Sequence, residues 1–211
     1  MKRLYCILLV LVIVWGNVCA QDGQQYKVRI YDDEEELVDT IMSFVALEEV
    51  LHLFGGFNYP TLDHGILGDS VSRLFNDTVE FKIYKAKFDS SKYESVEFYD
   101  DLNHIGSVNG KKVWGTDGGI PQWAIEKMEF KRNDRVVNIP TVSYIDLFEP
   151  NIGCYYVTHS KSDWCYTKGY ITDRNKLIIS MSNSDAAGGY EVIFVFNMDG
   201  ELENRAVGHG F

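Results

Sequence analysis

The sequence predicts a mainly β, α+β fold, namely an antiparallel β-sandwich or rolled sheet with one N-terminal helix packed against it. From Thr78 onward, short segments alternate apolar and polar residues, which is typical of strands with one buried face. Turn-forming pairs such as Asn133-Asp134 and Asp199-Gly200 separate these segments. Short strands that follow one another through tight turns favour antiparallel sheets.

The N-terminus has the features of a secretory signal peptide. Two basic residues precede an apolar run from Leu4 to Trp15, and Val18-Cys19-Ala20 offers small or apolar residues at the cleavage position. The run is shorter than the ~20 apolar residues that a membrane span needs. We therefore expect residues 1–20 to be removed. Residues 21–211 would form a single globular domain, exported to the periplasm or the extracellular space.

The mature chain is strongly acidic. Loss of the two basic residues in the leader leaves 18 basic against 31 acidic residues, a net charge of −13. This balance disfavours nucleic acids and anionic membrane surfaces, because both are bound by clustered lysine and arginine. It favours a cationic partner. An acidic surface that serves only to keep the protein solvated is the commoner explanation of such a charge.

Two cysteines remain after the leader, Cys154 and Cys165. An even pair in an exported chain predicts a disulfide, and a hairpin that turns near His159-Ser160 would place the two cysteines opposite each other. Such a bridge stabilises by up to about 3 kcal/mol in the chain-entropy model. A redox or metal-binding pair is the alternative. Because the chain has no Cys-x-x-Cys motif and no histidine at zinc-ligand spacing from a cysteine, we predict a structural bridge and no metal site.

One strand and two helices are expected before Thr78. Alternation from Tyr26 to Ile30 predicts the strand. The acidic residues that follow are typical of a first helical turn, where carboxylates complement the free N–H groups. Gly55-Gly56 would end this helix, which we predict over Glu34 to Phe54. A second, short helix is predicted around Asp69 to Phe75.

After Thr78 the pattern predicts strands. In the segment from Glu191 to Phe196, the apolar residues Val192, Ile193, Phe194 and Val195 follow one another without a polar residue, so we expect both faces of this strand to be covered. The other predicted strands are Val79–Tyr84, Met128–Lys131, Val136–Ile139, Tyr166–Tyr170, Leu177–Met181 and Leu202–Val207.

Two glycine-rich acidic loops form the candidate binding region. The first runs from Gly115 to Gly119, and the second from Asp185 to Tyr190. Phosphate binding is disfavoured, because the first loop contains Asp117 and is followed by Pro121 rather than by a lysine or a helix start. Calcium fits the aspartates better, but the spaced aspartates of a calcium loop are missing, so no cofactor is predicted.

Aromatic residues gather in and beside these loops. Aromatic platforms flanked by acidic residues suit sugar stacking, and clusters of Tyr and Trp also suit protein interfaces. Each such residue taken alone is more often an ordinary core or edge aromatic. The residues predicted to form a binding surface are Trp114, Asp117, Trp123, Trp164, Asp185 and Tyr190.

No catalytic motif of the G-x-S-x-G or H-E-x-x-H kind is present. We therefore predict an exported, non-catalytic binding protein of the inhibitor or immunity type, which recognises another protein through its acidic, aromatic surface. A carbohydrate-binding module is one alternative. A hydrolase that uses scattered carboxylates is another.

Overall fold

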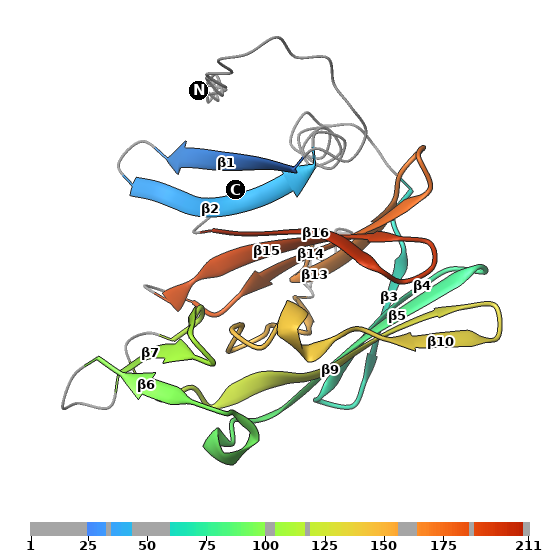
Figure 1. The fold of residues 1–211 in the computed structure, drawn as a ribbon. Helices are drawn as coiled ribbons and strands as arrows, with labels where there is room; N and C mark the ends of the chain where they lie inside the picture. Colours follow the sequence, from blue (N-terminus) through green and yellow to red (C-terminus); the bar gives the residue numbers. More distant parts are fainter. Residues whose placement is uncertain are drawn as a thin grey trace, which may run out of the picture.

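Antiparallel strands make up most of the part of the chain that the structure describes (Figure 1). This computed structural model describes residues 25–32, 35–43, 60–99, 104–116, 119–155, 164–185 and 188–208. The prediction of a mainly β, antiparallel fold is confirmed. The predicted signal peptide lies outside the described ranges. Within those ranges, no helix has the length and apolar character needed to cross a bilayer.

The first large sheet has five antiparallel strands in the order β10-β9-β5-β4-β3. Alternation along β5 buries Val79, Phe81 and Ile83, as the sequence predicts. In the turn between β9 and β10, Asn133 has a left-handed φ of 52°, which asparagine tolerates better than most residues. The strands are β3 (Asp63–Leu67), β4 (Val71–Phe75), β5 (Val79–Lys87), β9 (Trp123–Arg132) and β10 (Arg135–Asn138).

The second large sheet is an antiparallel meander in the order β13-β14-β15-β16. Its turns include Asn175 and Gly200, whose φ angles are 60° and 84°. Every residue from Val192 to Phe196 is buried, so both faces of β15 are covered, as predicted. The strands are β13 (Thr167–Ile171), β14 (Lys176–Asn183), β15 (Tyr190–Asn197) and β16 (Leu202–Gly208).

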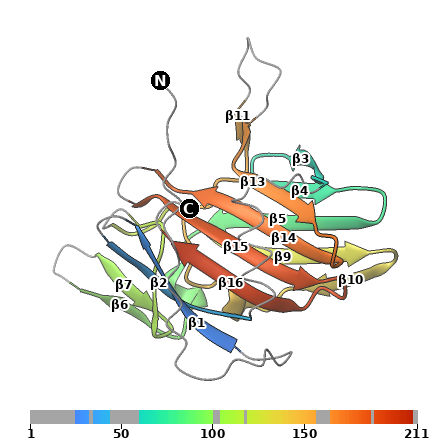
Figure 2. The ribbon, with the colours of Figure 1, turned by 90° about the horizontal axis from the view of Figure 1, so that it is seen from above.

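The two large sheets stack face to face, with their strands crossing at an angle (Figures 1 and 2). Buried side chains from both sheets form one apolar cluster between them. Within it, the ring centroids of Phe81 and Phe196 lie 5.2 Å apart. Where Gly169 of β13 faces the first sheet, a Cβ would lie 3.3 Å from Leu74 Cδ1 of β4, and 2.8 Å from Cδ1 of Leu62, which precedes β3. This packing is consistent with the predicted β-sandwich.

Smaller elements surround the two sheets in the described part of the chain. A hairpin of β1 and β2 lies beside β16, and the β11–β12 pair projects beyond the sheets (Figure 2). The remaining elements are β1 (Gln25–Asp32), β2 (Glu35–Ser43), η1 (Ser90–Lys92), β6 (Val96–Phe98), β7 (Ile105–Val108), β8 (Lys111–Lys112), η2 (Thr141–Ser143), β11 (Cys154–Tyr155) and β12 (Trp164–Cys165); η1 and η2 are single turns of 3-10 helix.

The helix predicted over Glu34 to Phe54 is wrong where the structure describes it. Residues 35–43 form strand β2, which pairs antiparallel with β1, with Asp39 opposite Arg29. The acidic start resembles a helix cap, but the β-branched residues that follow it favour a strand once a neighbouring strand satisfies their backbone groups. Residues 44–54 lie outside the described ranges.

The short helix predicted around Asp69 to Phe75 is also wrong. Residues 71–75 form β4, in the interior of the five-stranded sheet. Ser72 and Leu74 are buried while their neighbours are half-buried, the two-residue period of a strand. In so short a segment, pairing with β3 and β5 outweighs local helix propensity.

One ion pair is buried between the sheets. Arg205 of β16 donates two hydrogen bonds to the carboxylate of Asp146, at 2.9 and 2.7 Å, and the two side chains are only 16% and 7% exposed. Asp146 belongs to the chain that follows η2, so the pair ties this connection to the second sheet. The Nε atom of Arg205 has no hydrogen-bond partner among the described residues. Asp146 is therefore essential for compensating the buried guanidinium.

We predict that Asp146→Ala lowers the free energy of unfolding by about 3–5 kcal/mol, because it leaves the Arg205 charge buried without a partner. The matched control is Asp199→Ala. It breaks the Arg135–Asp199 pair, whose side chains are 66% and 69% exposed and lie 3.4 Å apart, and should cost less than about 1 kcal/mol. Urea denaturation of both variants measures the difference. Equal losses in the two variants would refute a structural role for the buried pair.

Candidate functional site

A cleft of about 670 Å³ lies where the two glycine-rich loops meet. The first loop contributes residues on both sides of Asp117, which itself lies outside the described ranges. The second loop contributes Asp185, and Ser184, which directly precedes that loop, also lines the cleft. The other walls come from β5, the start of β9, residues 149–151 and Tyr166, which directly precedes β13. The described lining residues are Lys85, Gly115, Thr116, Gly119, Ile120, Pro121, Gln122, Trp123, Glu149, Pro150, Asn151, Tyr166, Ser184 and Asp185.

Residues 146–151, which we call the connecting segment, join the two loops through backbone hydrogen bonds. The Trp114 amide donates to Asp146 O and the Phe148 amide donates to Trp114 O, both at 2.9 Å. Further along, Glu149 O accepts a hydrogen bond of 3.0 Å from the Ser184 amide. The connecting segment thus contacts the residue before the first loop and then the residue before the second, which places both loops on the same cleft.

Glu149 adds a second set of contacts with its side chain. Its carboxylate accepts hydrogen bonds from the backbone amides of Gln122 and Trp123, the latter at 3.1 Å. Its backbone amide donates to Trp123 O at 3.0 Å. The backbone of Glu149 has a φ of 48°, which is uncommon for a residue other than glycine. This backbone conformation accompanies a carboxylate directed at the start of β9, so Glu149 fixes one wall of the cleft.

Gly115 allows the first loop to approach the connecting segment closely. Its φ is 90°, and a Cβ there would overlap the backbone of Phe148 and come within 2.7 Å of the Tyr190 ring. Behind it, the Tyr190 hydroxyl donates to Phe148 O at 2.9 Å, and Ser184 Oγ donates to Gly115 O at 3.2 Å. Burial raises the pKa of the Tyr190 hydroxyl well above its usual range, so this group remains a neutral donor.

The cleft combines aromatic, amide and charged groups. Trp123 is half-buried, and Lys85 Nζ lies 4.9 Å from the centroid of its ring, within the range of a cation–π contact. Asp185 is exposed, and so is Ile120, at 55%. The cleft also includes Tyr166. It can therefore take both an apolar group and groups that form hydrogen bonds.

The structure places the predicted binding residues in different environments. Trp123 and Asp185 line the cleft. Trp114 and Tyr190 are buried in the core behind it, with ring centroids 6.3 Å apart, so they support the loops and do not line the cleft. The position of Asp117 is not described, and Trp164 is placed only by its backbone in β12.

Several cleft residues were missed from the sequence. Glu149 follows Phe148 and precedes Pro150, so the sequence predicts only that a strand ends here. Gln122 and Tyr166 carry no motif at all. The proline after Glu149 favours an extended backbone at that residue, whereas its φ is 48°, and nothing in the local sequence identifies the amides that the carboxylate binds.

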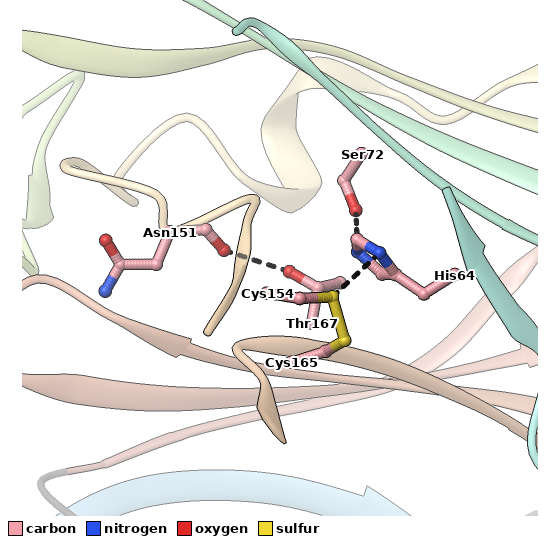
Figure 3. Close-up of a disulfide and its surroundings, with 6 residues drawn as sticks. All are labelled: His64, Ser72, Asn151, Cys154, Cys165 and Thr167. Carbon is pink, nitrogen blue, oxygen red and sulfur yellow. Dashed lines mark hydrogen bonds between the residues drawn. A yellow bond between two sulfur atoms is a disulfide. The ribbon is translucent and has the colours of Figure 1, made fainter. Parts of the chain in front are cut away.

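The predicted Cys154–Cys165 disulfide is present. The two cysteines lie directly opposite each other in the β11–β12 pair, as expected for a hairpin; the turn itself lies outside the described ranges. His64 of β3, which was not predicted, approaches the bridge with Nδ1 3.0 Å from Cys154 Sγ (Figure 3). Its Nε2 atom lies 3.0 Å from Ser72 Oγ.

These contacts assign the histidine tautomer. A disulfide sulfur has no hydrogen to donate, so His64 Nδ1–H is the donor and Nε2 accepts from the Ser72 hydroxyl. Burial lowers the pKa of His64, which favours this neutral form.

The chain matches no protein-family model, no curated protein and no solved structure. The cleft and the disulfide with its neighbouring histidine are therefore the features from which function is inferred.

We predict that Gly115→Ala destabilises the protein by about 1–3 kcal/mol, because alanine is strained at a φ of 90° and its methyl group would collide with the connecting segment. Gly119→Ala is the control, since a Cβ at Gly119 meets no atom within 4 Å. This second variant should unfold at nearly the same temperature as the parent. Thermal unfolding followed by circular dichroism compares the two, and an equal effect of both substitutions would show that the close approach at Gly115 is unimportant.

Proposed function

We propose that this protein is an exported, non-catalytic binding protein that holds a segment of another protein in the cleft between its two glycine-rich loops. The observation that carries the proposal is the cleft itself: an open hollow with exposed Ile120, half-buried Trp123 and the Asp185 carboxylate. Protein interfaces combine a few aromatic or apolar anchors with a polar rim. A volume of about 670 Å³ is large enough for one or two side chains of a partner.

The fixed position of the loops supports this proposal. Backbone hydrogen bonds to the connecting segment and the Glu149 carboxylate hold both sides of the cleft before any partner arrives. A site that is already ordered loses less conformational entropy on binding, which favours affinity. Such pre-organisation suits an inhibitor or immunity-type protein, which must bind its partner tightly.

The charge of the chain suggests the chemistry of the partner. With a net charge of −13 after loss of the leader, the protein would attract a basic partner over a long range and raise the association rate. In the cleft, Asp185 is available to a lysine or arginine of that partner. The leader and the disulfide both fit a partner met in the periplasm or outside the cell.

A carbohydrate is the second candidate ligand, and one specific observation favours it. Trp123 and Tyr166 share the cleft with Gln122 and with Asn151, whose Nδ2 also donates a hydrogen bond to Ser184 O. Aromatic rings can stack on sugar rings, and amides can bind sugar hydroxyls. A glycosidase is less well supported, because Glu149 already uses its carboxylate to accept backbone hydrogen bonds.

The test uses the mature protein as bait in extracts of the host's envelope and medium, with crosslinking, followed by titration of the recovered partner. Trp123→Ala and Ile120→Asp should each weaken binding on the order of tenfold or more, because they remove anchors from the cleft. Val142→Asp is the control, since Val142 is as exposed (61%) but does not line the cleft. Binding to a basic partner should also weaken as salt concentration rises.

Two results would contradict the proposal. In the first, a partner binds the Trp123 and Val142 variants equally well, which would place the interface elsewhere. In the second, a polysaccharide array retains the protein in a way that depends on Trp123, and no protein is recovered. That result would select the carbohydrate.

A further inference from the structure

We propose that reduction of the Cys154–Cys165 disulfide creates a zinc site formed by the two thiolates and His64. The potential ligand atoms of these three residues lie within 4.8 Å of one another, the one such group of three found among the described residues (Figure 3). This site is separate from the proposed binding function, and neither depends on the other.

The three ligands come from elements that hold them together independently of the bridge. His64 lies on β3, which pairs with β4 of the large sheet. The cysteines lie opposite each other on β11 and β12, and Thr167 just beyond Cys165 anchors this pair by donating to Asn151 O at 3.0 Å. All three potential ligands are half-buried, so an ion and a reductant can both reach them.

The donor set suits zinc. Two cysteines and one histidine, with water in the fourth position, form a known type of tetrahedral zinc site. Zinc binds sulfur at ~2.3 Å and nitrogen at ~2.0 Å, so its tetrahedral ligands lie roughly 3.5–3.8 Å apart. His64 Nδ1 is already 3.0 Å from Cys154 Sγ. Once the covalent bond is broken, rotation of the cysteine side chains can provide the remaining separation.

Ser72 supplies the partner that a zinc-bound histidine requires. A histidine that binds zinc through Nδ1 has its proton on Nε2, and that N–H usually donates to a neighbouring oxygen. Ser72 Oγ lies 3.0 Å from His64 Nε2, and Ser72 is completely buried in β4. A hydroxyl both donates and accepts, so it stabilises one tautomer beside the disulfide and the other beside the metal.

The redox step balances with a dithiol as reductant. Two electrons and two protons pass from the dithiol to the bridge, which yields two cysteine thiols and converts the dithiol to its own disulfide. Zinc binding then releases two protons as the thiols become thiolates. Reoxidation by a disulfide of the same class reverses both steps and releases the ion, so the metal is bound only in the reduced state.

The experiment uses cobalt(II) as a spectroscopic probe of the mature protein, reduced with a phosphine that does not compete for metal. The reduced protein should bind one cobalt ion, with a thiolate-to-cobalt charge-transfer band and intense d–d bands that zinc abolishes. The oxidised protein should show neither. His64→Ala should weaken cobalt binding by at least tenfold, and Ser72→Ala by about 10–100-fold. His104→Ala, at a histidine packed on Tyr99 instead, should bind as the parent does.

Circular dichroism in the same titration covers the case in which the reduced protein loses structure. Zinc should then restore the spectrum of the parent but not that of His64→Ala. A metal that binds the three ligands only as the folded chain arranges them stabilises the folded state. The proposal is overturned if the reduced parent binds no cobalt, or if the reduced His64→Ala variant binds cobalt as tightly as the parent. It is also overturned if zinc restores both spectra equally.

Discussion

The hydrogen bonds of the connecting segment, residues 146–151, fix the geometry on which the rest of the site depends. This segment contacts the second sheet through the buried Asp146–Arg205 pair and the first loop through the backbone of Trp114. It then contacts the start of β9 and the second loop through Glu149. The first of these contacts compensates charged groups that would otherwise be costly to bury. The shape of the cleft thus depends on the hydrogen bonds that this segment makes with Trp114, the start of β9 and Ser184.

The same arrangement explains why the large aromatic residues beside the loops are not all available to a ligand. Trp114 and Tyr190 pack behind the loops and hold them in place, whereas Trp123 lies on the wall. The proposed binding function therefore depends on two groups of residues. One group contacts the partner, and the other keeps the cleft in shape. Substitutions in the second group should affect stability and binding together.

Most strands of the two large sheets could be predicted from the sequence, because a two-residue period, or a continuous apolar run as in β15, is local information. The turns at Asn133 and Gly200 were also predictable, because these turns need a positive φ and asparagine and glycine are among the few residues that accept one. The helix predicted over residues 34–54 is wrong over β2, where antiparallel pairing with the preceding strand β1 outweighs the acidic start. The contacts of Glu149 with Trp123 and of His64 with Cys154 span 26 and 90 positions, and no local pattern encodes such distances.

Amide hydrogen exchange of the parent and of Glu149→Ala tests most directly whether the connecting segment holds the two loops as one unit. Removal of the carboxylate eliminates the acceptor of the Gln122 and Trp123 amides and releases the backbone of residue 149, whose carbonyl binds the Ser184 amide. An arrangement in which one segment holds both loops predicts faster exchange at all three amides, while those of β14 and β15 remain as protected as in the parent. Unchanged protection at Ser184, with faster exchange at Gln122 and Trp123 alone, would show that the two loops are held independently and would contradict it.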